Sequence, residues 1–313
     1  MATINNSLNT VTSGETTGVQ TAENKEFYNR TLLKRLTGSL IFAKHGQKKS
    51  APKHEGDTTN FRRVESLEPV TDKLVEGVTP DGNNFKVSTI KATVEQYGDY
   101  VIITDQLDLM GIDPVATEMV DVLGEQAAET IDNKVKDVIF AGTNVQYVGG
   151  GASRSALGAD NVITGAEVKK AVRTLRNNKV KPAQGGYYIG FIDPSCAYDL
   201  MEDKLWQDVS KYNGGEKIMK GEIGKIHGVR FIETSNPAVF EGTVEVHGTL
   251  IFGEGAYGVV DIEGSVKPEV IIKPQGTLND PLNQRSSIGW KALFKAVRLQ
   301  ELAMVRIESA VSA

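Results

Sequence analysis

The clearest chemical motif in the chain is a run of glycines at residues 253–258, which read GEGAYG. The spacing G-x-G-x-x-G is that of a turn that binds the pyrophosphate of a dinucleotide, because glycines let the backbone approach the phosphates closely. Such a turn must also open a helix, whose N-terminus holds the anion. Here the next residues are VVDIEG, which alternate like a strand. We interpret the run as a connection between two strands, with a nucleotide-binding α/β enzyme as an alternative.

The histidines give no indication of a metal centre. The chain has four, and no two of them have the spacing that places two ligands on one helix face. A site built from His45, His54 and Asp57 is the one combination that stays open. The single cysteine, Cys196, excludes a disulfide framework and a Cys-based metal site. We predict that the histidines are solvated loop residues and that the chain holds no metal.

Two segments contain a potential nucleophile. Ser195 and Cys196 follow an Asp-Pro pair, where a serine serves the start of a helix, and the segment lacks the G-x-S-x-G elbow of hydrolases. Ser50 and Lys53 have the spacing S-x-x-K, but a proline intervenes and no companion motif is present. We expect Cys196 to be a small buried residue. The sequence therefore predicts no catalytic residue, no cofactor and no enzymatic activity.

A basic segment over residues 44–63 has a different character. Its cations outnumber Glu55 and Asp57 three to one and are Lys44, Lys48, Lys49, Lys53, Arg62 and Arg63. One interpretation is a patch that neutralises nucleic-acid phosphates. The other is a surface that docks on acidic groups of a second copy, and the rest of the chain has 29 basic against 38 acidic residues. We favour docking, with a merely solvated loop as the next interpretation, and the candidate docking residues are Lys48, Lys49, Lys53, Arg62 and Arg63.

Charge and composition exclude several classes of protein. The chain has 313 residues and a net charge of −5, whereas a dedicated nucleic-acid binder is usually basic. The first twenty residues lack the basic start and apolar core of a signal peptide. No apolar run approaches the ~18 residues that a spanning helix needs. We expect a protein that folds in a reducing compartment.

The element pattern begins with an arm and a projection. Residues 1–22 are polar and without period, and residues 23–43 have helical spacing. The segment 45–99 contains two stretches of strand-like alternation around a Pro-Asp-Gly turn. We interpret it as a long two-stranded projection that leaves the body and returns to it. Because an isolated hairpin is marginal in water, it needs a partner surface.

A long helix over residues 113–141 is the strongest single prediction. Asp113 can cap it, Pro114 suits its first position, and apolar residues follow at a period of 3.6. We place Val122 among these buried apolar residues and expect Val122→Asp to impair folding. At 1.5 Å per residue the helix is ~40 Å long, enough to cross the molecule as a spine.

The remainder of the chain is mixed α and β. Helices are expected at residues 166–177 and from Asp193-Pro194 through Leu200. Strands are expected at residues 187–192, 229–233, 244–252, 257–262 and 266–273, with long strands over 285–308.

The order of several motifs resembles the major capsid proteins of tailed bacteriophages, and most of all the branch named after the major capsid protein of coliphage N-four. The motifs are EGVTPDG at 76–82, QYGDYVIITDQLD at 96–108, GTNVQY at 142–147, FIDP at 191–194, GEIGKIHGVRFIET at 221–234 and DPLNQRSSIGW at 280–290. The resemblance implies an α+β fold of the Hong Kong 97 type. Its expected parts are an N-terminal arm and helix (1–44), an extended β-hairpin loop (45–99), a peripheral domain with the spine helix (100–144), an axial domain (145–262) and peripheral return strands (263–313).

The function implied by this resemblance is a shell protein. Copies of the chain would form hexamers and pentamers of an icosahedral head around double-stranded DNA, without sequence-specific binding and without a membrane. The short arm and the Met1 start lead us to expect a separate scaffolding protein, together with a portal and a decoration protein, and assembly in the host cytoplasm. No cross-linking site between subunits can be carried over. An encapsulin-like nanocompartment shares the fold and is the main alternative.

Overall fold

The structure is a computed structural model. It describes residues 11–12, 15–16, 32, 40–51, 57–64, 84–110, 115–183, 185–203, 224–262, 268–273 and 284–312, together with the single positions 67, 73, 76, 77, 82 and 282. The predicted arm and the predicted helix over 23–43 lie mostly outside these ranges. Within them, β1 (Val11–Thr12) pairs with β2 (Glu15–Thr16). The short helix α2 (Phe42–His45) begins near the end of the range predicted to be helical.

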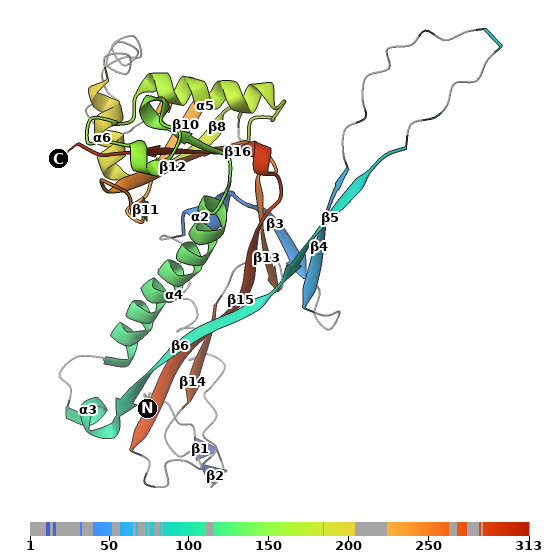
Figure 1. The fold of residues 1–313 in the computed structure, drawn as a ribbon. Coiled ribbons are helices and arrows are strands. Elements are labelled where there is room, and N and C mark those ends of the chain that lie inside the picture. Colours follow the sequence, from blue (N-terminus) through green and yellow to red (C-terminus); the bar gives the residue numbers. More distant parts are fainter. Residues whose placement is uncertain are drawn as a thin grey trace.

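A seven-stranded mixed sheet forms one end of the molecule (Figure 1). Its order is β7 (Val145–Tyr147), β16 (Met304–Ser309), β12 (Val246–Phe252), β8 (Tyr188–Ile192), β10 (Val229–Glu233) and β9 (Lys225–Ile226), with β11 (Ala238–Phe240) paired to β12. Every position of β8, β12 and β16 is buried. Continuous burial is typical of strands that are covered on both faces. The helices α5 (Gly165–Asn177) and α6 (Pro194–Glu202) lie beside this sheet and help to cover it.

A second sheet runs away from the first and is built around one long strand, β15 (Arg285–Arg298). On one side, β15 pairs with β6 (Glu95–Thr104) from Arg285–Thr104 to Phe294–Glu95. On the other side it pairs with β13 (Tyr257–Ile262) and β14 (Glu269–Lys273). The strand β3 (Gln47–Ala51) adds to β13 in parallel. The long antiparallel pairing of β6 and β15 gives the molecule its elongated form (Figure 1).

The strands expected from sequence are present, but two of them lie in the other sheet. The expected domain boundaries group β13 with the α/β section and β16 with the return strands. The observed pairing is the reverse. β13 pairs with β15 in the second sheet, and β16 pairs with β12 in the seven-stranded sheet. The 3-10 turn η3 (Glu301–Ala303) lets the chain pass from β15 in one sheet to β16 in the other.

The predicted spine helix is α4 (Val115–Phe140), which lies across β15 and β6 (Figure 1). Its inner face is apolar, as expected, and Leu123, Ile131 and Val135 are buried. The placement of Val122 on that face was wrong, since its side chain is 56% exposed. The proposed cap, Asp113-Pro114, lies outside the described residues. In the ranges given above, no helix is both long and apolar enough to cross a membrane.

The predicted projection is present as a two-stranded ribbon. The strands β4 (Thr58–Val64) and β5 (Val87–Thr93) pair from Thr58–Thr93 to Val64–Val87 and point away from the body (Figure 1). The chain enters the ribbon from β3 and leaves it into β6. Toward its outer end, Val64 and Val87 are 65% and 45% exposed, and Phe85 just beyond is 68% exposed. These apolar side chains have little cover from their own subunit.

A buried ion cluster fastens the seven-stranded sheet to the loop before α5. Glu308 on β16 is fully buried and accepts two hydrogen bonds of 2.7 Å from the Arg154 guanidinium. The Arg306 Nε lies 2.9 Å from a Glu308 carboxylate oxygen. Both guanidinium groups lie over the Phe240 ring, at 4.3 and 4.9 Å from its centroid. The bond to Glu308 raises the pKa of Arg154, whereas burial lowers the pKa of Arg306.

Candidate functional site

The base of the ribbon is anchored through one aromatic side chain. Phe61 of β4 is buried and packs with Ala92 of β5 and Val260 of β13 in a small apolar cluster. The ring covers Gly258 so closely that a Cβ atom there would come within 2.7 Å of the Phe61 ring. The ribbon is thus fixed to the body at its base, and the outer part extends beyond it.

An open groove of about 890 Å³ lies between β3 and the ribbon. Four of the five predicted docking residues line it, namely Lys48, Lys49, Arg62 and Arg63. Lys49 donates a 2.5 Å hydrogen bond to the Asn60 carbonyl. Within the described part of the chain, none of the four cations is paired with a carboxylate. The fifth residue, Lys53, lies outside the described residues.

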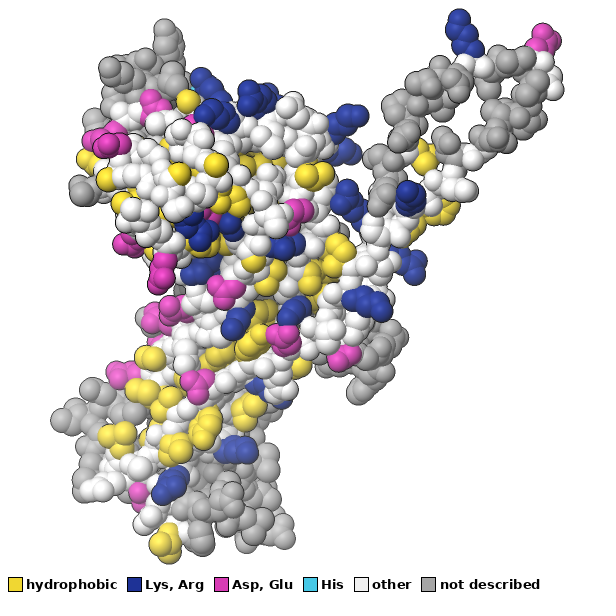
Figure 2. Space-filling model, viewed as in Figure 1, with side chains coloured by type: hydrophobic (Ala, Val, Ile, Leu, Met, Phe, Trp, Pro, Cys, Tyr) yellow, Lys and Arg dark blue, Asp and Glu magenta, His cyan; other side chains and the backbone are white. Residues whose placement is uncertain are grey.

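The outer face of α4 has the opposite charge. Carboxylates recur at helical spacing along it, at Glu118, Asp121, Glu125 and Glu129. The side chains of Glu118, Glu125 and Glu129 are exposed, and Asp121 is half-buried. Figure 2 shows Lys and Arg around the base of the projecting ribbon, and Asp and Glu along the edge where α4 lies. The division between a basic projection and an acidic body, expected from sequence, is therefore present among the described residues.

The GEGAYG segment is a connection between strands, as predicted. It joins β12 to β13, and no helix follows it. Gly255 has a φ of +69°, which favours glycine at the turn. A Cβ atom at Gly253 would come within 2.5 Å of the Lys181 carbonyl oxygen, and Gly258 receives the Phe61 ring. Each glycine has a packing or conformational role. Because the strand β13 follows directly, the segment also lacks the helix N-terminus that a dinucleotide requires.

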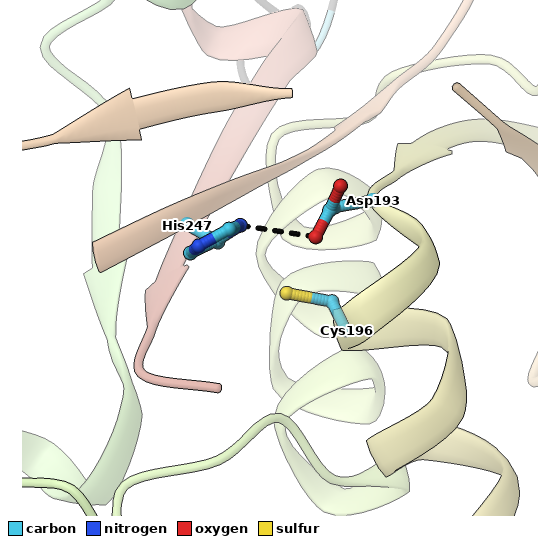
Figure 3. Close-up of side chains that lie close together, drawn as sticks. All are labelled: Asp193, Cys196 and His247. Carbon is cyan, nitrogen blue, oxygen red and sulfur yellow. Dashed lines mark ion pairs between the residues drawn. The ribbon is translucent and has the colours of Figure 1, made fainter. Parts of the chain in front are cut away.

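A second group of side chains lies under α6, where three buried residues converge (Figure 3). Asp193 precedes the helix and caps it by accepting a hydrogen bond from the Ser195 amide. The Nδ1 atom of His247, on β12, lies 3.0 Å from a carboxylate oxygen of Asp193. Cys196 is fully buried, as predicted, and burial raises the pKa of its thiol to about 12. A neutral, inaccessible thiol is not a nucleophile.

The histidines differ from the sequence-based expectation of solvated loop residues. His247 is buried in the central strand β12 with only 7% of its surface exposed. His45 is half-buried beside Phe191, and burial lowers its pKa. His54 lies outside the described residues, so the combination with His45 and Asp57 is untested. Sequence reasoning missed the Asp193–Cys196–His247 group because His247 comes from a strand far along the chain. The buried, strand-like run around His247 was the available signal.

These observations define a class of protein. Among the described residues, Cys196 and His247 are buried, and the exposed features are a projecting ribbon, a cationic groove and an acidic helix face. These exposed features are typical of a structural protein that makes contacts with other chains.

Comparison with known proteins identifies the family. The family model described as "Phage capsid protein" matches residues 86–307. No curated protein matches the chain. The chain belongs to the phage capsid protein family, and it is a major capsid protein of the phage head.

Solved structures of similar fold agree with this assignment. The capsid of Ralstonia phage GP4 has a TM-score of 0.68 and 14% identity, with 88% of this chain and 92% of that chain covered. The capsid of cyanophage P-SCSP1u has a TM-score of 0.65 and 16% identity, with 88% and 89% covered. A virus-like particle from Pyrococcus furiosus has a TM-score of 0.54 and 14% identity, with 91% and 100% covered. The fold is therefore of the Hong Kong 97 type.

Proposed function

We propose that copies of this chain form hexamers and pentamers of a closed icosahedral shell around double-stranded DNA, with the ribbon as the principal contact between neighbours. The observation that carries the proposal is the ribbon itself. It projects from the body, exposes Val64, Phe85 and Val87, and has at its base a groove lined by cations that have no carboxylate partner among the described residues. A two-stranded ribbon is marginal in water, so these side chains need cover from a second subunit.

The proposed docking partner of the groove is the outer face of α4 on a neighbouring copy. Lys48, Lys49, Arg62 and Arg63 supply one charge, and the carboxylates from Glu118 to Glu129 supply the other. Lys53 is part of the same proposal. Opposite charges on separate faces of one chain support a heterologous contact, which closes into rings when the angle permits. Burial of the exposed apolar residues at the outer end of the ribbon would stabilise the contact between subunits, and the charges would set the orientation of the two subunits.

The two sheets correspond to the two parts of the proposed shell subunit. The seven-stranded sheet, within residues 145–262 and completed by β16, would be the axial domain at the capsomer centre. The five-stranded sheet with α4, within residues 100–144 and 263–298 and completed by β13 and β3, would be the peripheral domain. Residues 1–44 would be the arm, and residues 45–99 the extended loop. The contacts at the centres of hexamers and pentamers would then lie between axial domains, whereas the ribbon contacts the peripheral domain of a neighbour.

The assembly partners and the branch of the capsid protein family are inferred from the sequence alone. A separate scaffolding protein, a portal and a decoration protein would take part in assembly in the host cytoplasm, and the finished shell is the virion capsid. The motif order supports the branch named after the coliphage N-four capsid protein. The net negative charge of the chain, −5, supports an inner wall that encloses DNA without binding it tightly.

Particle formation and particle contents test this function separately. The purified chain, with scaffolding protein from the same phage, should give megadalton shells by light scattering and electron microscopy. A chain that stays monomeric under all such conditions would refute the shell. The compartment alternative draws on the fold match to the Pyrococcus furiosus particle. Shells isolated from infected cells distinguish the two, since DNA and a portal vertex favour the phage head and a packaged enzyme favours the compartment.

A further inference from the structure

The group under α6 places three metal-ligating side chains together in the interior. Their donor atoms, the Cys196 Sγ, a His247 imidazole nitrogen and a carboxylate oxygen of Asp193, all lie within 4.8 Å of one another. The three residues are 0%, 7% and 5% exposed. In Figure 3 the imidazole and the carboxylate point toward each other, and the thiol points into the same space. The residues come from the cap and first turn of α6 and from the facing strand β12.

Hydrogen bonding in this part of the interior is incomplete. The His247 Nδ1 atom is close to Asp193, but among the described residues it has no hydrogen-bond partner of acceptable geometry. The hydroxyl of Thr249, two residues along β12 and fully buried, has the Cys196 thiol as its one side-chain partner among the described residues. A buried polar atom without a partner destabilises the folded state, so native proteins rarely leave one without an ion, a water or a function to explain it.

We propose that, contrary to the sequence-based prediction of no metal and no Cys-based site, Asp193, Cys196 and His247 form a binding site for a thiophilic divalent cation, and zinc fits the three ligands best. Thiolate, imidazole and carboxylate are the three ligand types of protein zinc sites. Tetrahedral coordination at the usual bond lengths separates such donor atoms by roughly 3.3–3.6 Å. The imidazole nitrogen and the carboxylate oxygen are 3.0 Å apart and all three donor atoms lie within 4.8 Å of one another, which is close to that separation. Ser309, whose hydroxyl lies 3.7 Å from the Cys196 sulfur, or a water is the fourth ligand.

Two further side chains lie close to the proposed ligands. The other imidazole nitrogen of His247 lies 3.6 Å from a carboxylate oxygen of the exposed Glu245, which is beyond hydrogen-bond distance. Ser309 stands opposite His247 in the pairing of β12 with β16. The bound cation would tie the start of α6 to the centre of the seven-stranded sheet. It would therefore stabilise the folded subunit by an amount that grows with the logarithm of its concentration over its dissociation constant.

Metal binding here must displace a proton. Burial raises the pKa of the Cys196 thiol to about 12, and the carboxylates of Asp193 and Asp199 act in the same direction. The thiol is therefore protonated near neutral pH without a metal. A metal ion that binds the thiolate would release that proton to solvent.

The test uses Co²⁺ as the probe, because Cys196 is the only cysteine of the chain. A thiolate-to-cobalt charge-transfer band in the near ultraviolet can therefore report only on this residue. The full-length protein is stripped with a chelator, titrated with Co²⁺, and then titrated with Zn²⁺. We expect a band that saturates at one Co²⁺ per chain and that Zn²⁺ abolishes. Absence of the band at millimolar Co²⁺ in the folded wild-type protein would overturn the proposal.

Variants locate the site. Cys196→Ser keeps the size of the side chain and should remove the band, and His247→Asn should weaken Co²⁺ binding at least tenfold. His227→Asn is the matched control, because His227 lies at the β9–β10 turn and should leave the titration unchanged. A band that survives Cys196→Ser, or a His247→Asn titration identical to the control, would overturn the assignment. The wild-type titration decides the question even if a variant fails to fold. A negative titration would leave the proposed shell function unaffected, since particle formation is measured separately.

Discussion

Charge reversal in the groove, by the double variant Arg62→Glu and Arg63→Glu, tests the proposed contact between subunits. Both side chains are exposed on β4 and line the groove with two lysines. The change takes the charge of these four side chains from about +4 to about zero. Because the residues have no carboxylate partner in the described part of their own chain, the isolated subunit should keep its stability within about 0.5 kcal/mol.

The size of the effect follows from the charges at the interface. An exposed ion pair contributes about 0.2–1 kcal/mol, and reversal converts each attraction into a repulsion of similar size. Two reversals therefore weaken one contact by about 2 kcal/mol. Since 1.4 kcal/mol corresponds to a factor of ten, the contact weakens about 30-fold. Each subunit contributes one ribbon, so the protein concentration at which shells appear should rise by about the same factor.

Light scattering against protein concentration measures this threshold, with sedimentation to separate shells from free subunits. The matched control is Arg62→Lys with Arg63→Lys, which keeps the charge and should stay within threefold of wild type. Raising the salt from about 0.1 M to about 1 M shortens the screening length from about 10 Å to about 3 Å. The wild-type threshold should therefore move toward that of the Glu variant. A Glu variant that assembles at the wild-type threshold in low salt would refute the docking role of the groove.

Four further substitutions test the subunit itself, each by urea unfolding of unassembled protein. Glu308→Ala leaves the buried Arg306 guanidinium and the partly exposed Arg154 guanidinium without their carboxylate partner and should cost about 3–5 kcal/mol, whereas no change would show that the cluster is dispensable. Val122→Asp should cost less than about 0.5 kcal/mol because Val122 is exposed, while Ile131→Asp on the buried face should cost at least about 3 kcal/mol. Equal losses would contradict the orientation of α4. Gly258→Ala should cost about 1–3 kcal/mol by displacing Phe61, and it should speed proteolysis at the ribbon base; unaltered cleavage would argue against that anchor.

Local pattern was sufficient for the elements whose signals are short-range. The bounds of β10 and β13 were predicted from alternation alone, and α4 from its 3.6-residue period. The absence of a helix after GEGAYG was also readable, because a strand pattern follows the glycines directly. The cations of the projection were visible as composition, and their concentration in one groove follows from the pairing of β4 with β5 beside β3.

Side-chain orientation at the edge of a helix face could not be read from the sequence. Val122 and Leu123 are both apolar neighbours at the boundary of the stripe, and a periodic pattern does not say which of them faces the sheet. The structure buries Leu123 and exposes Val122 because β15 and β6 lie on only one side of α4.

The sequence by itself determined the elements, the charge division and the absence of a recognisable catalytic motif, since each of these is encoded within a few neighbouring residues. The sheet to which a strand belongs is a different kind of property. β13 and β16 exchange sheets relative to the expected boundaries, because pairing depends on partners that are distant in the chain. For the same reason, the meeting of His247 with Asp193 and Cys196 had no local signature. It exists because β12 packs beneath α6, and only folding brings the three donors together.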